Sequence, residues 1–414
     1  VEEILEEEEK KEGAEKKAAT VSGVEIEDLE KIAKDTSVVK LVNQMLSDAI
    51  NQRATDIHIE PYRHNVKVRY RIDGILYNIQ MPSEIKRLYQ AIVSRIKILS
   101  NLNVVERRLP QDGRAIVKIQ DKQVDLRISV IPSIYGENVV VRILPVNLMF
   151  SLSDLGLDDR DRRVIEELIT KPHGIIFLTG PTGSGKTTTL YACLSRLNKE
   201  SVKIITIEDP VECELEGITQ IQVKPEIGFT FANALRSILR HDPDIMMVGE
   251  VRDFETAELS IRTSLTGHLI FSTLHTNYAA SGATRLIDIG IEPYLISSSV
   301  LAFISQRLVR QICPYCKKEK KNNTLLLEHL SGQKVYYGTG CPKCANLGYM
   351  GRTAIYEILV VDDEIRQLIM NKSSAGDIAK AAHRKGFRNL LEAGVDKIKQ
   401  GITTPEEVIR VVGV

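Results

Sequence analysis

A glycine-rich segment in the middle of the chain has the residue types and spacing of a phosphate-binding loop. It reads GPTGSGKTT over residues 180–188 and follows an apolar run at 175–177. Glycines let backbone N–H groups converge on a phosphate without interference from a Cβ atom. The lysine of such a loop places its charge beside the β- and γ-phosphates, and the next hydroxyl binds Mg²⁺. The predicted nucleotide-binding residues are Gly180, Pro181, Thr182, Gly183, Ser184, Gly185, Lys186, Thr187 and Thr188.

Acidic residues and a histidine follow three other apolar runs. Glu208 closes the first run, with Glu212 close behind, Glu250 closes the second, and His275 closes the third. If these runs are parallel strands, their carboxyl ends meet at one edge of a sheet, beside the phosphate loop. Carboxylates there can hold Mg²⁺ through water and orient the attacking water of a hydrolysis reaction. Acidic residues after strands are also turn formers, but two beside a phosphate loop favour a functional role.

Two histidines flank the third run. His268 and His275 lie seven residues apart across a predicted strand, a spacing that does not suit zinc. Two interpretations stay open for them: a sensor of the γ-phosphate, and a buried histidine whose ring is bonded to the backbone.

Four of the six cysteines form two CxxC pairs, CPYC at 313–316 and CPKC at 341–344. Two such knuckles, separated by 24 residues, suit a tetrahedral Zn²⁺ ion with two thiolates from each. Disulfides are the alternative, which a cytosolic location disfavours. The predicted zinc ligands are Cys313, Cys316, Cys341 and Cys344.

Composition narrows the classes of protein. Lys and Arg total 55 and so do Asp and Glu, so that the net charge is zero. The charge balance argues against nucleic acid as the main ligand. No apolar stretch approaches the length of a membrane span and no signal peptide opens the chain, which favours a cytosolic protein.

The 414 residues have room for two or three domains. The pattern predicts a charged tether at 1–35, a mixed α/β domain at 36–145 and a linker at 146–156. Beyond the linker, strands alternate with helices, as in a parallel doubly wound sheet. The expected later segments are an α/β core at 157–312, a tetracysteine subdomain at 313–350 and a mostly helical region at 351–414. Within 36–145, the predicted elements are helices at 37–53 and 85–99, strands at 66–72, 115–119, 124–131 and 138–144, and a hairpin turn at 73–74.

Four segments resemble the motifs of the secretion ATPases, the motors of bacterial type II secretion and type IV pilus assembly. They are, in order, GPTGSGKTTTLYA, ITIEDPVE, LRHDPDIMMVGEVRD and TGHLIFSTLHTN. The resemblance extends to ATDIHIEP, VRYRIDG and PQDGR upstream and to QRLVRQICPYC and GRTAIYEIL downstream. It implies a RecA-like ATPase domain preceded by a PAS-like domain, ATP as the nucleotide, and a hexameric ring. It also implies roles for Glu208 and Glu212 in an acidic box, for Glu250 as the Walker B glutamate, and for His268 and His275 in a histidine box.

Two arginines gain a role only through the resemblance. By pattern alone, Arg127 in VDLRIS and Arg142 in VVVRIL are solvated side chains on strands. The resemblance implies that they reach the γ-phosphate bound by a neighbouring subunit, where an arginine stabilises charge in the transition state.

The expected function is therefore a hexameric cytoplasmic motor that couples ATP hydrolysis to assembly of a pilus or pseudopilus. Its expected partners are the inner-membrane platform and docking proteins of a secretion or pilus system, which would hold it peripherally at the membrane. The short charged segment before residue 36 favours a fragment of a longer protein. The alternatives are a nucleic-acid translocase with a zinc ribbon and a nucleotide switch, although the chain lacks the Asn-Lys-x-Asp motif of GTPase switches.

Overall fold

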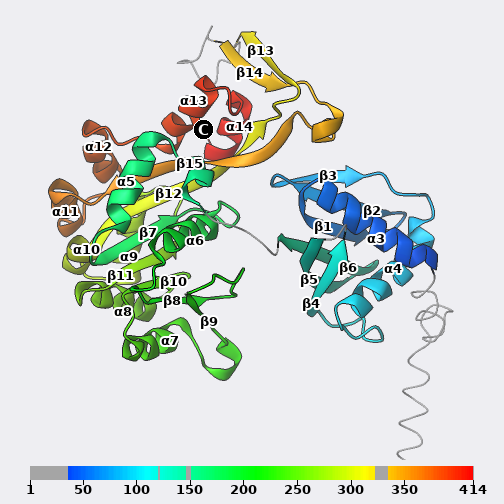
Figure 1. Cartoon of the computed structure of the whole chain (residues 1–414), viewed down its shortest axis with the longest axis horizontal. Coiled ribbons are helices and arrows are strands. Elements are labelled where there is room, and N and C mark those ends of the chain that lie inside the picture. The colour runs from blue at the N-terminus through cyan, green and yellow to red at the C-terminus, as the bar shows by residue number, and fades with distance from the viewer. Residues whose placement is uncertain (1–35, 120–121, 146–150, 322–333, 414) are drawn as a thin grey trace, which may run out of the picture. The chain divides into compact units, whose positions relative to one another are not determined.

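The computed structural model describes residues 36–119, 122–145, 151–321 and 334–413 (Figure 1). The chain forms two compact units, one up to residue 147 and one from residue 148. The predicted tether at 1–35 and the first part of the predicted linker, 146–150, lie outside the described residues.

The first unit is a six-stranded antiparallel sheet with two helices. The strand order is β3-β2-β1-β6-β5-β4. Asp73 and Gly74 have φ of 49° and 88°, as the predicted two-residue hairpin turn between β2 and β3 requires. The elements are α3 (Thr36–Asn51), β1 (Ala54–Pro61), β2 (Val66–Ile72), β3 (Ile75–Ile79), α4 (Ile85–Leu99), β4 (Gln111–Ile119), β5 (Lys122–Ser133) and β6 (Gly136–Pro145).

Helices α3 and α4 cover one face of this sheet. Met45 of α3 and Ile96 of α4 pack with Ile57 and Leu126, which point to the same face from β1 and β5. Because side chains alternate along a strand, neighbouring residues such as Arg127 point to the other face. One face of the unit is thus an apolar core. We call the other the polar face, because it carries Asp56, Arg127 and Arg142, with the exposed Ile116 beside them.

The second unit is built on a seven-stranded sheet of order β15-β12-β7-β11-β10-β8-β9. All neighbours are parallel except β15, which is antiparallel to β12. The elements that build it are η1 (Leu152–Leu155), α5 (Asp159–Ile169), β7 (Gly174–Thr179), α6 (Lys186–Leu197), β8 (Ile204–Glu208), β9 (Thr219–Gln222), η2 (Pro225–Ile227), α7 (Phe231–Ile238), η3 (Leu239–His241), β10 (Ile245–Val248), α8 (Phe254–Leu265), β11 (Leu269–Leu274), α9 (Ala280–Ile289), α10 (Pro293–Ser299), β12 (Val300–Ile312) and β15 (Tyr349–Val360).

Both faces of the central strands are buried. Along β10, Met246 belongs to one apolar cluster and Met247 to the other, and Phe177 and Ile176 of β7 divide in the same way. Helices on both faces explain why these strands are continuous apolar runs with no alternation. Polar side chains that could do chemistry are therefore placed where the strands end.

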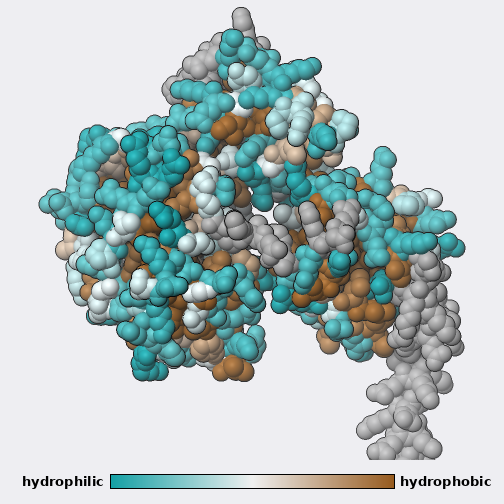
Figure 2. Space-filling model, in the orientation of Figure 1, coloured by the Kyte–Doolittle hydropathy of each residue, from teal (hydrophilic) through white to brown (hydrophobic). Residues whose placement is uncertain are grey.

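The rest of the second unit lies beyond β12. Helix α11 buries Ile365 and Ile369, α12 buries Ile378, Ala381 and Ala382, and Figure 2 shows mostly hydrophilic residues over their outer side. None of the described helices combines the length and apolar character that crossing a bilayer requires. The elements here are β13 (Lys317–Lys321), β14 (Lys334–Gly338), η5 (Pro342–Cys344), α11 (Asp363–Met370), α12 (Ala375–Arg384), α13 (Leu390–Lys399) and α14 (Pro405–Val412).

Two segments differ from the sequence-based expectation. Leu152 and Leu155, inside the expected linker, are buried in the core of the second unit with Ile165. Strand β15 starts within the expected tetracysteine segment and continues into the region expected to be mostly helical. It forms because β12 would otherwise be the sheet edge, and the 12 residues of β15 pair with nearly its whole length.

A helical glycine tests the packing between α9 and the sheet. A Cβ atom at Gly282 would lie 2.3 Å from a ring carbon of Phe303 on β12. We expect Gly282→Ala to lower the free energy of unfolding by about 1–3 kcal/mol despite the higher helix propensity of alanine. Gly376→Ala in α12 is the control, because its Cβ would meet only Ser374 Oγ at 3.6 Å. Equal denaturant midpoints for the two variants would contradict this packing.

Candidate functional site

The phosphate loop joins the end of β7 to the start of α6. Gly180, Gly183 and Gly185 have φ of 143°, 79° and 88°, values that L side chains rarely adopt. A Cβ atom on Gly180 would lie 2.7 Å from the Gln306 carbonyl oxygen, and one on Gly185 would lie 2.8 Å from the Gln306 side-chain nitrogen. The glycines are thus needed both for the backbone conformation and for the close approach of β12 behind the loop.

The side chain of Lys186 extends back over the phosphate loop and contacts its first residues. Its Nζ donates to the carbonyl oxygens of Gly180 at 2.8 Å and Pro181 at 3.2 Å. Burial lowers the pKa of Lys186 and the charge of Arg307 lowers it further, whereas the nearby Glu250 opposes both effects. A phosphate beside this ammonium would favour its charged form.

The hydroxyls of the loop fit a phosphate and a hydrated metal ion. Pro181, Thr182, Gly183, Thr187 and Thr188 are exposed. Ser184 Oγ is buried and has no hydrogen-bond partner among the described residues. The loop offers backbone donors, one ammonium and accessible hydroxyls in a small volume, which is the donor set that Mg²⁺-bound nucleotide phosphates need.

Glu250 and His275 meet at the same edge of the sheet. Glu250 follows β10, its side chain is 13% exposed, and its two oxygens contact Arg252 at 2.5 Å and His275 Nε2 at 3.3 Å. The side chains of Ser272 and Thr273 donate to the carbonyls at the end of β10, at 2.7 and 2.8 Å, and so hold β11 against it. Since β11 lies between β10 and β7, Glu250, His275 and the phosphate loop occupy three adjacent strand ends.

Glu208 lies at this edge but is already engaged by protein donors. It is 4% exposed and accepts hydrogen bonds from the Tyr191 hydroxyl, from Thr206 Oγ1 at 2.6 Å and from Gln220 at 3.1 Å. Burial, and then the bond to Glu208, raises the pKa of Tyr191. Glu212 is exposed in the loop that follows β8, and its backbone N–H donates to Tyr191 at 3.4 Å. These contacts connect β8, β9 and α6.

The two predicted histidines are at opposite ends of β11. His268 precedes the strand, and its Nδ1 lies 3.2 Å from both the Thr263 carbonyl and the Thr266 hydroxyl, at the end of α8. The structure therefore does not bring His268 to the phosphate loop, whereas it brings His275 there. Of the two interpretations left open, bonding to the backbone matches His268.

Arg127 and Arg142 belong to the first unit and the phosphate loop to the second. The two arginines are cross-strand partners on β5 and β6. Arg142 Nε donates to Asp56 at 3.0 Å, and Asp56 itself is buried on β1. Both arginines lie on the polar face of the first unit, which α3 and α4 leave uncovered.

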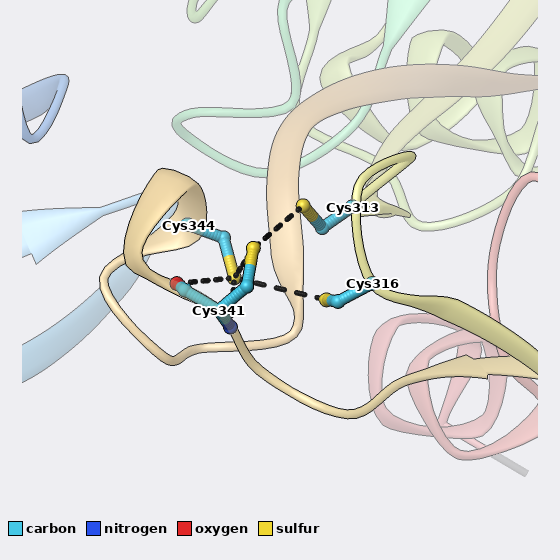
Figure 3. A group of neighbouring side chains, drawn as sticks. All are labelled: Cys313, Cys316, Cys341 and Cys344. Carbon is cyan, nitrogen blue, oxygen red and sulfur yellow. Dashed lines mark hydrogen bonds between the residues drawn. The ribbon is translucent and has the colours of Figure 1, made fainter.

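The four predicted cysteine ligands converge (Figure 3). Neighbouring sulfurs lie 3.7–3.9 Å apart and all four lie within 4.8 Å of one another. A tetrahedral site with Zn–S bonds of about 2.3 Å requires sulfurs about 3.8 Å apart, so the cluster fits zinc closely. Burial acts to raise the pKa of Cys344, but the backbone N–H groups of Cys341 and Gly348, each 3.3 Å from its Sγ, together with the side chains of Cys341 and Cys313, lower this pKa to about 7.

Sequence reasoning missed two residues behind the loop, Gln306 and Arg307 on β12. Gln306 is 1% exposed and its side-chain oxygen accepts from Thr189 of α6 at 2.8 Å. Arg307 donates to Asn277, two residues beyond His275, at 2.9 Å. Both belong to the QRLVRQ segment, but their place beside the loop depends on the pairing of β12 with β7, which the sequence does not display.

Known proteins resemble this chain along most of its length. Residues 31–410 match the family model described as Type II/IV secretion system protein. A type II secretion system protein E from Xanthomonas campestris pv. campestris is 47% identical over 395 residues, which cover 94% of this chain and 69% of that protein. The type II secretion system ATPase E of Vibrio cholerae is 47% identical over 93% of this chain and 77% of its own length. The type IV pilus assembly ATPase PilB of Myxococcus xanthus is 46% identical, covering 93% and 69%.

Solved structures have the same fold. The pilus retraction motor PilT with bound ADP is 26% identical with a TM-score of 0.58, covering 89% of this chain and 96% of that one. The ATPase DotB of Legionella pneumophila is 23% identical with a TM-score of 0.65, covering 88% and 93%, and shows the fold alone. With a family model that matches nearly the whole chain and relatives near 47% identity, the protein belongs to the type II/IV secretion system protein family.

Proposed function

We propose that this chain is a motor ATPase that couples ATP hydrolysis to the assembly of a pilus or pseudopilus, in type II secretion or in type IV pilus biogenesis. The observation that carries this proposal is the placement of the phosphate loop, His275 and Glu250 on adjacent strand ends in a chain of this family. The relatives named above are secretion and pilus-assembly proteins, which supports this function over a nucleic-acid translocase.

In this proposal the loop residues bind and the strand-end residues catalyse. Backbone N–H groups of the loop and Lys186 hold the phosphates of ATP, and Thr187 binds Mg²⁺, which neutralises charge on the phosphates when bound. Glu250 orients the attacking water, and the contact with His275 fixes the direction of its carboxylate. Glu208 and Glu212 support the site from β8, with Glu208 held by its three donors rather than free to move.

The motor acts as a hexameric ring in this proposal. In this proposal the first unit is a PAS-like domain that precedes a RecA-like ATPase domain. Its Arg127 and Arg142 would reach the γ-phosphate bound by the next subunit. Hydrolysis then depends on the position of the neighbour, so that chemistry in one subunit moves the next. The ring would stand on the cytoplasmic side of the inner membrane, bound there through platform and docking proteins.

We also propose that the four cysteines bind one structural Zn²⁺ per chain. The cluster has the sulfur spacing of a tetrahedral site and N–H donors to one thiolate, and it has no position left for a substrate or water. Its role is therefore to fold the segment between β12 and β15.

Replacing the proposed catalytic carboxylate separates binding from hydrolysis. Glu250→Gln keeps the shape of the site but removes the charge that orients water, so we expect ATP binding near the parent level and turnover lower by about 10²–10⁴-fold. The measurements are affinity for a fluorescent ATP analogue and steady-state phosphate release. Glu258→Gln is the control, since Glu258 pairs with Arg262 on the surface of α8. Hydrolysis at the parent rate by Glu250→Gln would exclude Glu250 as the catalytic group.

Mixed rings test whether arginines act across subunits. We expect Lys186→Ala and Arg142→Ala to be inactive alone, the arginine variant because a trans arginine is worth about 10³–10⁵ in rate. Rings reassembled from both variants should regain part of the activity, since some sites combine an intact lysine with an intact neighbouring arginine.

The control for this experiment mixes Lys186→Ala with Glu250→Gln. Both lesions lie in the same chain's half of the site, so no mixed ring contains an intact site and activity should stay absent. If the first mixture is as inactive as the control, the shared-site mechanism is wrong.

Metal analysis tests the cysteine cluster. We expect one Zn²⁺ per purified chain, because structural zinc contributes about 10–16 kcal/mol of apparent binding energy in small finger peptides. Cys344→Ser should release the metal and expose the segment between β12 and β15 to protease, while the fluorescent ATP analogue still binds. Cys193→Ser is the matched control, because Cys193 is buried in the core far along the chain from the cluster. Protein with four paired cysteines and no metal would contradict the assignment.

A further inference from the structure

Arg307 stands directly behind the phosphate loop. Strand β12 runs parallel to β7 with Ser305 opposite Thr179, so Arg307 comes just past the point where β7 gives way to the loop. A Cβ atom on Gly180 would lie 3.1 Å from Arg307 Nη1, and Lys186 Nζ donates to the Gly180 carbonyl at 2.8 Å. Two cations therefore lie against the first residue of the loop.

The contacts of Arg307 are unusual for a buried arginine. The residue is 9% exposed, and its nitrogens donate to the Gln306 carbonyl at 3.0 Å and to the Asn277 carbonyl at 2.9 Å. The Asn277 side-chain oxygen lies 3.3 Å away. Within the described part of the chain, Arg307 forms no ion pair with a carboxylate. Arg310, three residues later on the same strand, instead pairs with Glu407 at 2.8 Å. Burial lowers the pKa of Arg307, and the nearby buried carboxylate of Glu357 on β15 opposes this effect. A second anion at the phosphate loop would offset more of the desolvation cost of the guanidinium.

Asn277, which accepts from Arg307, lies close in the chain to the residues that surround Glu250. Asn277 is two residues beyond His275, whose Nε2 lies 3.3 Å from Glu250. The Asn277 carbonyl also accepts from Ser305 at 3.0 Å, so β12 holds this segment with two neighbouring side chains. Arg307 is thus hydrogen-bonded to Asn277, the chain leads from Asn277 back to His275 over two residues, and His275 contacts Glu250.

We propose that Arg307 is a positioning residue of the hydrolytic site, which holds residues 275–277 against the phosphate loop so that His275 and Glu250 are aligned with the bound phosphates. The inference rests on the proposed ATPase function. Arg307 acts in hydrolysis rather than in folding in this proposal, because two of its three hydrogen bonds end on Asn277, in the loop that carries His275. The negative charge of the phosphates draws the guanidinium towards Gly180, which ties the alignment of Glu250 to the presence of nucleotide.

The test measures binding and turnover separately in the full chain. Arg307→Lys keeps the charge but cannot span both carbonyls, and we expect kcat to fall about 10-fold while affinity for a fluorescent ATP analogue changes less than about 3-fold. Arg307→Gln should lose more of kcat. Arg310→Lys is the matched control, because it removes a guanidinium from the same strand. This variant should keep the parent kcat. If Arg307→Gln fails to fold, Arg307→Lys with a parent-like melting curve decides alone.

A double-mutant cycle distinguishes alignment from general destabilisation. If Arg307 acts through His275, the variant Arg307→Lys/His275→Ala should turn over no more slowly than His275→Ala. Losses that multiply, a kcat unchanged by Arg307→Lys, or equal losses of affinity and kcat would each overturn the inference. Failure of the proposed function would give a different result. The parent chain would then hydrolyse no ATP, or Lys186→Ala would hydrolyse ATP at the parent rate, whatever the Arg307 variants do.

Discussion

The hydrogen-bonded register of β12, β7, β11, β10 and β8 is the constraint on which the candidate site depends. Thr179 pairs with Leu274, and Val248 pairs with both Ser272 and Ile207, so four strands end at nearly the same level. A slip of one residue would move a strand end by about 3.3 Å and turn its side chains to the other face. Burial of both sheet faces resists such a slip. The apolar core therefore fixes the positions of the polar residues at the strand ends.

Local signals explain what the sequence could predict. The phosphate loop is a short motif in which each glycine has a positive φ, and the strands that lead to Glu250 and His275 begin as the apolar runs 245–248 and 269–271. The cysteine pairs needed only their spacing. In each case the information lies within a few consecutive residues.

Long-range pairing explains what the sequence could not predict. The role of Gln306 arises because β12, more than 100 residues after β7, becomes its neighbour in the sheet. Likewise, the three neutral donors to Glu208 come from α6, β8 and β9, and the sequence does not show that they converge on this carboxylate. The PAS-like assignment of the first unit stays a prediction, and so do the trans roles of Arg127 and Arg142.

Strand β12 connects the chemistry to the cysteine cluster. Arg307 stands at the phosphate loop, and Cys313 directly follows Ile312, the last residue of the same strand. Ile312 donates to the Ile402 carbonyl, and Glu407 of α14 accepts from the backbone and side chain of Arg310, which anchors the strand between these points. The pairing of β12 with β7 extends to Ser305, whereas its pairing with β15 continues to Ile312, with a register shift between Arg310 and Ile312. One strand therefore carries Arg307 beside the phosphate loop and ends directly before Cys313, and its pairing with β15 and its contacts with α14 fix the place of the cysteine cluster relative to the loop.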